Sequence, residues 1–392
     1  MRARSFWGMA LAGSSIVPVV AVVLAGCGTK FDLPTQSPGG VIPGDGSYHM
    51  EASWTGMNGI QDILLTPAGQ LFLLFRHSDT GPAPRGEVRA YGRLARTDSV
   101  PPPLVGYPFR TLFNPVALCD GGTSVFVLDQ GDTCEARRNP ATGSCDSTGG
   151  WTTDITDLSK YWRVREYDLV GTGGTGTLDT ISTFTDTSFA FVQGIAADAQ
   201  GNVYVAGVAI VNVPDQEDAR ILTRSLVQRV YRYARGAAGD ENMPGANWHR
   251  DKSWLVEDGA GTGFITDVRG IFLGTEYGAP KLFVADIGDK SVQRLDVTIA
   301  NVGQKTGGLQ SDDFLAPVDV AADLAEFFYV ADPSYQRVLR YAPDGSLVQR
   351  VDIEPDAIGR KLLLPVTVAA DSELVFVGDR GRSEVIRYRR RK

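Results

Sequence analysis

The chain has 392 residues, and 43% of them are hydrophobic, which is enough to bury a large core. Its 46 acidic residues outnumber its 38 basic residues, so the formal net charge is -8 at pH 7. An acidic domain repels phosphate backbones, which argues against a nucleic acid as partner. The basic tail over residues 387–392 is the exception, and we interpret it as a solvated strand end.

The chain begins with a short basic segment, Met1 to Arg4, and an apolar run over residues 6–25 follows. This is the pattern of a secretory signal peptide, although the run also approaches the length of a membrane span. Gly13-Ser14-Ser15 and Pro18 interrupt the run. The interruptions favour the signal peptide over a transmembrane anchor.

The apolar run ends in Leu24-Ala25-Gly26-Cys27, which resembles the lipobox of bacterial lipoproteins. In that family the cut falls before the cysteine, and the new N-terminal cysteine carries the lipid. The resemblance implies a signal peptide over residues 1–27, lipidation at Cys27, and an extracytoplasmic protein anchored to a membrane of the bacterial cell envelope. Cleavage would remove two arginines and no acidic residue, which takes the formal charge from -8 to -10.

Residues 28–47 are rich in Pro, Gly and polar side chains and cannot bury a core. We expect them to form a flexible linker between the lipid and the folded domain. The folded domain is then residues 48–392.

From residue 48 onward, β-branched and aromatic runs alternate with Asp, Gly and Pro clusters, which is typical of strands and turns. Two runs recur. One occurs as Leu71–Leu74, Val125–Leu128, Val203–Ala206, Leu282–Ala285, Phe328–Ala331 and Val375–Gly378. The other places Tyr or Leu three residues after Val88, Val164, Val230, Val292, Val338 and Val385. Repetition at roughly 40–50 residues, with four strands in each unit, predicts an all-β, six-bladed propeller.

The repeat resembles that of the NHL-repeat family of six-bladed β-propellers. The closest copy is Pro317–Tyr341, and Gln193–Asp198 with Gly201–Val205 is another. The resemblance covers about residues 48–392 and implies the fold. It carries little information on function, because propellers support many unrelated activities.

The segment Tyr48–Trp54 alternates apolar and polar residues and is predicted to be a strand. The last repeat, residues 365–392, supplies only three strands. We therefore expect Tyr48–Trp54 to pair with Glu384–Tyr388 as the outer strand of the last blade. Such pairing closes the ring and protects a sheet edge.

Two insertions separate the second and third strands of blades 2 and 3, at about 130–161 and 208–227. In the first insertion, the short spacing of Cys134 and Cys145 favours a disulfide in a secreted protein. Cys119 lies in an apolar strand and is expected to be a buried free thiol. No cysteine or histidine is spaced for a metal cluster.

Recognised catalytic patterns are scarce. The three histidines, His49, His77 and His249, lie in separate segments. Gluconolactonase-like propellers use Glu, Asn and Asp on a central metal, and their N-terminal Glu signature is not visible at Glu51. The run Asp129-Gln130-Gly131-Asp132 suggests calcium but lacks the alternation of an EF-hand loop, so we favour a structural turn. The Asp that recurs after the second strand and the Arg that recurs in the third strand are also interpreted as structural.

Alignment of the first strands places one residue of each blade in a column near the propeller axis: Asp62, Val116, Gly194, Gly270, Asp319 and Thr367. If the ring closes, Asp319, Thr367 and Asp62 lie on neighbouring blades. Two carboxylates beside a hydroxyl could hold a cation or a ligand amine, and the alternative is that they are solvated channel residues. On the same face, Trp151 and Tyr161 are candidate aromatic anchors, whereas Trp162, beside a strand, is assigned to the core.

Two classes of function remain open. The favoured one is a lipid-anchored binding or scaffolding module, monomeric, for a protein, peptide or glycan, on the face that carries the two insertions. The alternative is a metal-dependent hydrolase or lyase of the gluconolactonase-like type. No catalytic residue and no metal ligand is assigned, and calcium is the one cofactor considered.

Overall fold

The computed structural model describes residues 47–77, 86–92, 103–106, 112, 114–130, 162–168, 180–214, 222–236, 247–257, 265–298, 305–310, 314–351 and 361–391. All of them belong to one unit, Pro43–Lys392. Its regular structure is β-sheet, and within the described residues no helix is long and apolar enough to cross a bilayer.

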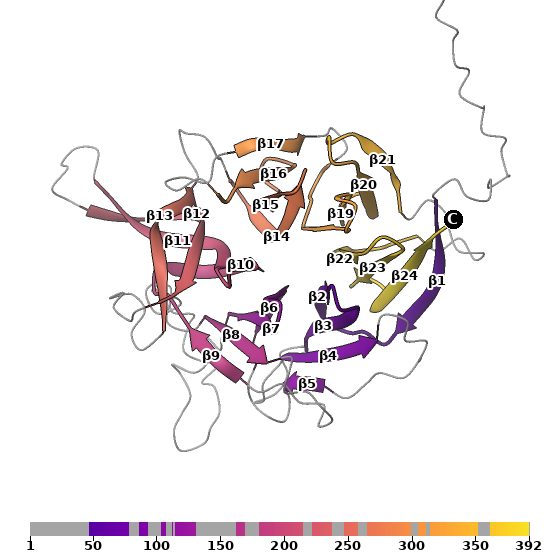
Figure 1. Cartoon of the computed structure of the whole chain (residues 1–392), viewed down its shortest axis with the longest axis horizontal. Helices are drawn as coiled ribbons and strands as arrows, with labels where there is room; N and C mark the ends of the chain where they lie inside the picture. Colours follow the sequence, from indigo (N-terminus) through magenta and orange to yellow (C-terminus); the bar gives the residue numbers. More distant parts are fainter. Residues whose placement is uncertain are drawn as a thin grey trace, which may run out of the picture. The chain divides into compact units, whose positions relative to one another are not determined.

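Six antiparallel sheets of four strands each surround a central axis, so the fold is the predicted six-bladed β-propeller (Figure 1). The first three blades are β2 Ile60–Leu65, β3 Gln70–Arg76, β4 Gly86–Gly92 and β5 Pro103–Gly106; β6 Pro115–Asp120, β7 Ser124–Asp129, β8 Arg163–Asp168 and β9 Thr180–Phe184; and β10 Phe189–Ala197, β11 Val203–Pro214, β12 Leu222–Arg235 and β13 Trp248–Glu257.

The remaining blades are β14 Val268–Glu276, β15 Ala279–Asp286, β16 Ser291–Asp296 and β17 Lys305–Gln310; β18 Asp319–Ala322, β19 Phe328–Asp332, β20 Arg337–Tyr341 and β21 Leu347–Arg350; and β22 Pro365–Ala370, β23 Leu374–Asp379, β24 Glu384–Arg390 and β1 Tyr48–Thr55. In each of the first five blades the strands run outward in chain order. The first strands therefore line the axis.

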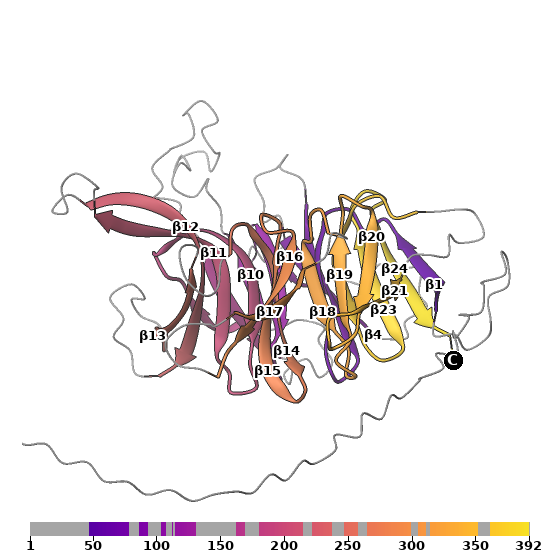
Figure 2. The same ribbon diagram turned by 90° about the horizontal axis from the view of Figure 1, so that it is seen from above.

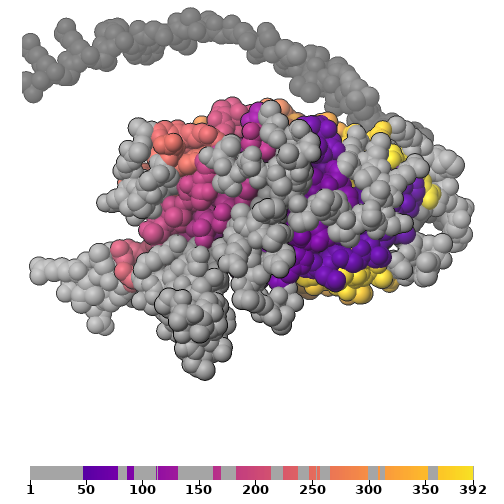
Figure 3. Space-filling view, turned by 90° about the horizontal axis from the view of Figure 1, so that it is seen from below, coloured from indigo at the N-terminus to yellow at the C-terminus, as the bar shows by residue number. Residues whose placement is uncertain are grey.

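The ring closes as predicted, because β1 is the outer strand of blade 6 and pairs with β24 from Thr55↔Glu384 to Tyr48↔Arg390. In the space-filling view, indigo N-terminal and yellow C-terminal residues lie side by side (Figure 3). Trp54 is buried and stacks on Tyr91 of blade 1, with ring centroids 5.1 Å apart. At the other end of β1, the Tyr48 hydroxyl lies 2.8 Å from that of Tyr329 in blade 5. This one strand therefore holds blade 6 against both of its neighbours.

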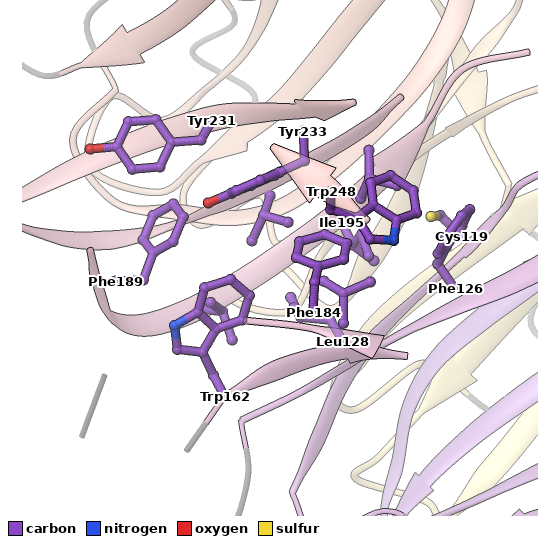
Figure 4. Close-up of a cluster of buried hydrophobic side chains, with 14 of the residues drawn as sticks. Cys119, Phe126, Leu128, Trp162, Phe184, Phe189, Ile195, Tyr231, Tyr233 and Trp248 are labelled. Carbon is purple, nitrogen blue, oxygen red and sulfur yellow. The ribbon is translucent and has the colours of Figure 1, made fainter. Parts of the chain in front are cut away.

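The second strand of each blade is the most apolar because it is covered on both faces by adjacent blades. All six residues of β7 and of β23 are buried, which accounts for a continuous apolar run in place of alternation. Between blades 2 and 3, aromatic rings fill the space (Figure 4). Phe184 lies 4.8 Å from Trp248, and Phe189 lies 4.9 Å from Tyr231, between ring centroids.

A β-bulge near the start of the first strand is shared by most blades and fixes the residue that faces the axis. In β6 the bulge falls between Pro115 and Ala117, so Ala117 pairs with Leu128. Val116 is the bulged residue, and its predicted place in the axial column was wrong by one position. The column is therefore Asp62, Ala117, Gly194, Gly270, Asp319 and Thr367.

Candidate functional site

Two of the predicted site residues meet directly at the axis. The Thr367 hydroxyl, from the first strand of blade 6, donates a hydrogen bond to Asp62 Oδ1 of blade 1 at 2.9 Å. Asp319, in the first strand of blade 5, is close enough to feel the charge of Asp62 and to bond with Thr367. The predicted proximity of these three side chains is therefore confirmed, while a role in ligand binding remains a prediction. We call Asp62, Thr367 and Asp319 the axial cluster.

The axial cluster also joins the blades, because each member accepts a backbone N–H from the next blade around the ring. The three bonds are Asp319 Oδ2 from Val368 at 2.8 Å, Thr367 Oγ1 from Ile63 at 3.1 Å, and Asp62 Oδ2 from Leu118 at 2.6 Å. The donor is in every case the residue that follows the column position. The cluster is thus a chain of bridges from blade 5 to blade 2.

Both carboxyl groups of the axial cluster are harder to ionise than usual. Burial raises the pKa of Asp62 to about 6, although hydrogen bonds from Leu118, Thr367 and Ile63 oppose that rise. Burial raises the pKa of Asp319 well above its usual value, and the neighbouring charge of Asp62 raises it further. Two coupled carboxyls of this kind favour retention of a proton as the pH approaches neutrality.

The donor set of the axial cluster fits a calcium ion poorly. Calcium takes about six to eight oxygen ligands. Here both oxygens of each carboxylate already accept a backbone N–H, since Asp62 Oδ1 also bonds Ile63 at 2.7 Å and Asp319 Oδ1 bonds Val320 at 2.9 Å. Within the described residues, no group of three or more His, Cys, Asp or Glu side chains could hold a metal ion.

Gly378 makes room for the hydroxyl-bearing side chain of the axial cluster. It pairs with Thr367, and a Cβ at Gly378 would lie 2.6 Å from Thr367 Cγ2. The corresponding position is Ala206, Ala285 and Ala331 in blades 3, 4 and 5. Glycine in place of alanine at this position of blade 6 therefore has a local steric cause, the neighbouring Thr367 side chain.

A second candidate surface is the extension of blade 3. The pairing of β11 with β12 continues to Pro214↔Leu222, whereas β10 pairs with β11 only as far as Ala209. On the other side, the pairing of β13 with β12 stops at Arg229. The residues beyond these points form a two-stranded extension that leaves the body of the propeller (Figure 2). We call Ile210–Pro214 and Leu222–Gln228 the ribbon.

On one face of the sheet, four apolar side chains of β10, β11 and β12 lie next to the polar side chains of Asn212, Arg224 and Gln228. Phe191 pairs with Val208, and Ile210 pairs with Leu226, so the four side chains share one face of the sheet. Phe191 is 42% exposed and Leu226 is 47% exposed. The predicted insertion near 208–227 is therefore partly an extended hairpin. Sequence analysis missed the exposed apolar side chains at its base, although Val208 and Ile210 already show the two-residue period.

No protein-family model and no curated protein matches the chain. A protein of unknown function from Bacteroides thetaiotaomicron matches with a TM-score of 0.51 at 11% identity, over 88% of this chain and 73% of that one. A putative gluconolactonase has a TM-score of 0.49 at 13% identity, over 89% and 94% of the two chains. Virginiamycin B lyase from Staphylococcus aureus has 0.48 at 9% identity, over 88% and 99%.

These likenesses show the fold alone. Membership in the NHL-repeat family stays a prediction.

Several predicted site residues lie outside the described residues: Cys27, Cys134, Cys145, Trp151 and Tyr161. Lipidation, the disulfide and the aromatic anchors therefore stay predictions. Trp162 is fully buried and donates its indole N–H to the Asp186 carbonyl at 2.8 Å, which confirms its assignment to the core. Cys119 is a buried free thiol as expected, and burial raises its pKa well above the usual value.

The Asp that follows the second strand is structural, as predicted. Asp286, Asp332 and Asp379 are fully buried, and each accepts backbone N–H groups from two loops. Asp332, for example, bonds Leu315 at 2.8 Å and Ser334 at 3.1 Å, so one carboxylate fixes the entry to the first strand and the turn after the second. Asp129 accepts the N–H of Asn114 at 2.8 Å in the same way, whereas Gly131 and Asp132 of the expected structural turn lie outside the described residues.

The third-strand arginines are structural, as expected, with ion pairs inside a blade and hydrogen bonds to the next blade. Arg232 pairs with Asp251 in its own blade and reaches the carbonyl of Val297 in the next blade at 3.2 Å. Arg294 likewise pairs with Glu276 and reaches Pro343 in blade 5 at 3.3 Å. Arg387 pairs with Glu51 across β24 and β1 at 2.9 Å, which gives Glu51 a structural partner. These ion pairs reinforce the blades.

Proposed function

We propose that the protein is a lipid-anchored extracytoplasmic β-propeller that binds a protein, peptide or glycan. The lipobox-like Leu24–Cys27 motif and the linker over residues 28–47 support the anchor. The resemblance to NHL repeats supports a rigid scaffold that presents loops. The proposed binding face is the one on which the second strands end and the first strands begin, where the two insertions emerge.

The observation that carries the binding proposal is the ribbon of blade 3. The ribbon leaves the sheet and contributes little to the propeller core, and Leu226 on the ribbon and Phe191 on the adjoining β10 are exposed. Exposed apolar side chains on a projecting element are typical of interaction sites. Among the described residues no further strand pairs with the two edges of the ribbon, so its backbone groups are available to an extended ligand.

The test is capture of envelope components by the full-length protein in detergent. A variant with Phe191→Ser and Leu226→Ser should lose a partner that the wild type retains, because both substitutions remove the apolar contact surface. Leu324→Ser is the matched control, since Leu324 is 82% exposed but lies in the turn after the first strand of blade 5, on the opposite face. Equal capture by both variants would count against the ribbon as the recognition element.

The proposed anchor has its own test, the substitution Cys27→Ser. The lipid is attached to the cysteine sulfur in the lipoprotein family that the motif resembles, so the variant should appear in the soluble fraction or persist as uncleaved precursor. Membrane fractionation and the mass of the N-terminal peptide report both outcomes. An unchanged fractionation and mass would show that Cys27 is not the attachment site.

A second candidate function, a hydrolase or lyase, rests on Asp62. A carboxyl with a pKa of about 6 on the propeller axis is suited to exchange a proton near neutral pH. Metal analysis of the purified protein distinguishes the two functions, because stoichiometric, tightly held calcium or zinc would favour the enzyme. Protein without such metal that still captures a partner through the ribbon would favour the binding module.

A further inference from the structure

A short turn joins the strand that closes the ring to the first strand of blade 1. β1 ends at Thr55 and β2 begins at Ile60, and the Ile60 N–H bonds the Met57 carbonyl at 3.3 Å. Asn58 and Gly59 therefore form the corner of the turn. The φ angle is positive at Gly59, 77°, but not at Asn58, which is the pattern of a type II turn. We call these four residues, 57–60, the closing turn.

Gly59 is fixed on its carbonyl side only. Its carbonyl accepts the backbone N–H of Arg76 at 2.8 Å and the side-chain amide of Gln61 at 3.2 Å. A Cβ at this position would overlap the Arg76 carbonyl oxygen, so the position requires glycine. Within the described residues, the Gly59 N–H donates no hydrogen bond. The main-chain nitrogen of Gly59 is therefore available for reaction.

The side chain of Asn58, which precedes that nitrogen, is unrestrained as well. Asn58 is exposed, and no hydrogen bond of the described chain involves its amide. Asn202 differs, because its amide donates to Asp198 at 2.7 Å and it precedes the buried Val203 of β11. Asn58 is also the only asparagine in the sequence that a glycine follows. An amide without a described partner thus precedes a nitrogen that no side chain of its own residue shields.

We propose that Asn58 is a site of spontaneous deamidation in the folded protein. The Gly59 nitrogen attacks Cγ of the Asn58 side chain, a C–N bond forms, and the amide nitrogen leaves as ammonia with the proton of the Gly59 N–H. The product is a five-membered cyclic imide, which then takes up a water molecule. Water addition at Cγ breaks the new C–N bond and gives aspartate. Addition at the main-chain carbonyl breaks the original peptide bond and gives isoaspartate, in which the chain runs through Cγ.

Isoaspartate adds a methylene group to the main chain of the closing turn. The residues on either side of Asn58 are tied to different blades. The Met57 N–H bonds the Ser383 carbonyl of blade 6 at 2.8 Å, and the Gly59 carbonyl bonds Arg76 of blade 1. We expect the longer turn to strain or break these bonds and to weaken the junction at which the ring closes. The inference goes beyond the proposed binding function and does not depend on it.

The experiment incubates the full-length protein in detergent at neutral and at mildly alkaline pH, well below its melting temperature. Peptide mapping by mass spectrometry measures the conversion of each asparagine, and an isoaspartyl methyltransferase assay measures isoaspartate. Asn58 should convert at least about tenfold faster than Asn212, which is also exposed but precedes a valine, because a β-branched residue hinders attack by its own nitrogen. Conversion should accelerate as the pH rises, since the deprotonated nitrogen is the attacking species.

Absence of conversion at Asn58, or conversion no faster than at Asn212, would overturn the site. Conversion only after unfolding in urea would overturn it too, because the closing turn would then protect Asn58 in the folded protein.

Two variants test the structural consequence. Asn58→Gln keeps an amide, but attack would have to close a six-membered ring, which forms much more slowly. This variant should therefore keep the melting temperature of fresh protein throughout the incubation. Asn58→Asp, measured fresh, carries the product's charge on an unaltered main chain and should melt like fresh wild type. The incubated wild type should melt at a lower temperature, in proportion to its isoaspartate content.

If isoaspartate accumulates while the melting temperature stays constant, the weakening of the closing turn is overturned. An equal loss of stability in fresh Asn58→Asp would assign the effect to charge and overturn it as well.

Discussion

The residues of the axial column divide the propeller into two halves, which differ in how the first strands of neighbouring blades are held together. In blades 5, 6 and 1 the column holds Asp319, Thr367 and Asp62, whose side chains bond the next blade. In blades 2, 3 and 4 it holds Ala117, Gly194 and Gly270, and at the two glycines the backbones approach instead. A Cβ on Gly194 would lie 3.1 Å from the Ile271 nitrogen, and one on Gly270 would lie 2.7 Å from the Val318 carbonyl oxygen.

The same backbone position is involved in both halves. In the polar half the column side chain accepts the N–H of the residue after the next column position, as Asp62 does from Leu118. At Gly194 that N–H belongs to Ile271 and faces the missing Cβ. Side-chain hydrogen bonds and close backbone contact are therefore alternative ways to hold neighbouring first strands together. Only the side-chain hydrogen bonds introduce titratable groups.

The largest expected effect is on the polar half, where the ring closes. Deletion through residue 56 removes β1, which buries Tyr48 and Trp54 and supplies the outer strand of blade 6. Loss of each large aromatic costs about 3–5 kcal/mol, so the truncated domain should melt far below the wild type or aggregate through the exposed β24. Differential scanning calorimetry measures the effect.

Deletion of residues 28–46 is the control for this truncation and should leave the melting temperature nearly unchanged. Equal melting temperatures for the two truncations would contradict the closing role of β1. A loss confined to blade 6, seen as a separate calorimetric transition, would mean that the axial cluster holds blade 6 without its outer strand.

The next prediction tests the close-packed half. Gly270→Ala should destabilise the domain by about 1–3 kcal/mol, because the new Cβ meets the Val318 carbonyl and Asp319. Gly194→Ala should be nearly neutral, since its closest contact, at 3.1 Å, is milder and alanine reduces the entropy of the unfolded chain. Chemical denaturation of both variants measures the difference. Equal effects would show that the glycines are not required by backbone approach.

A third prediction separates the halves by pH. The folded pKa of Asp62 is about 6, above its usual 3.8, so the folded state binds this proton more tightly than the unfolded state. Its stabilising contribution is therefore complete below about pH 3.8 and is lost as the pH rises through about 6. The change is on the order of 1–3 kcal/mol.

The readout is the difference in unfolding free energy between the wild type and Asp62→Asn, measured from pH 4 to 8. This difference should change with pH between about 4 and 6 and be flat above that range. Asp296→Asn is a contrasting control, because Lys281 and Thr298 lower the pKa of Asp296 to about 2 and its contribution should be constant above pH 4. A flat difference for Asp62→Asn would show that the axial carboxyls ionise normally.

Much of this architecture could be predicted from the sequence, because repeated apolar second strands and a lone N-terminal strand require a closed ring. The meeting of Asp62 with Thr367 was also predictable, since closure makes blades 6 and 1 neighbours. The bulge that replaces Val116 by Ala117 was not, because a single extra residue leaves the apolar pattern almost unchanged.

The smallest expected effect concerns the hydroxyl at the centre of the polar half. Thr367→Val keeps the shape of the side chain but removes the bond to Asp62 and the acceptor for the Ile63 N–H. The loss should be about 1 kcal/mol in unfolding free energy. Because the Thr367 hydroxyl lowers the pKa of Asp62, its removal should also raise that pKa and move the pH-dependent step upward.

Thr367→Ser is the matched control, since it retains the hydroxyl and loses only a methyl group. The pH at which its unfolding free energy changes should equal that of the wild type. Loss of the Thr367 methyl group, which lies next to Gly378, should lower stability only slightly. A common upward shift in both variants would mean that packing, and not the hydrogen bond, sets the ionisation of Asp62. If the pH of the stability step shifts in Thr367→Val alone, the hydroxyl belongs to the same chain of hydrogen bonds as the two carboxylates. The polar half is then held by side-chain hydrogen bonds that titrate, which the half with the two glycines lacks.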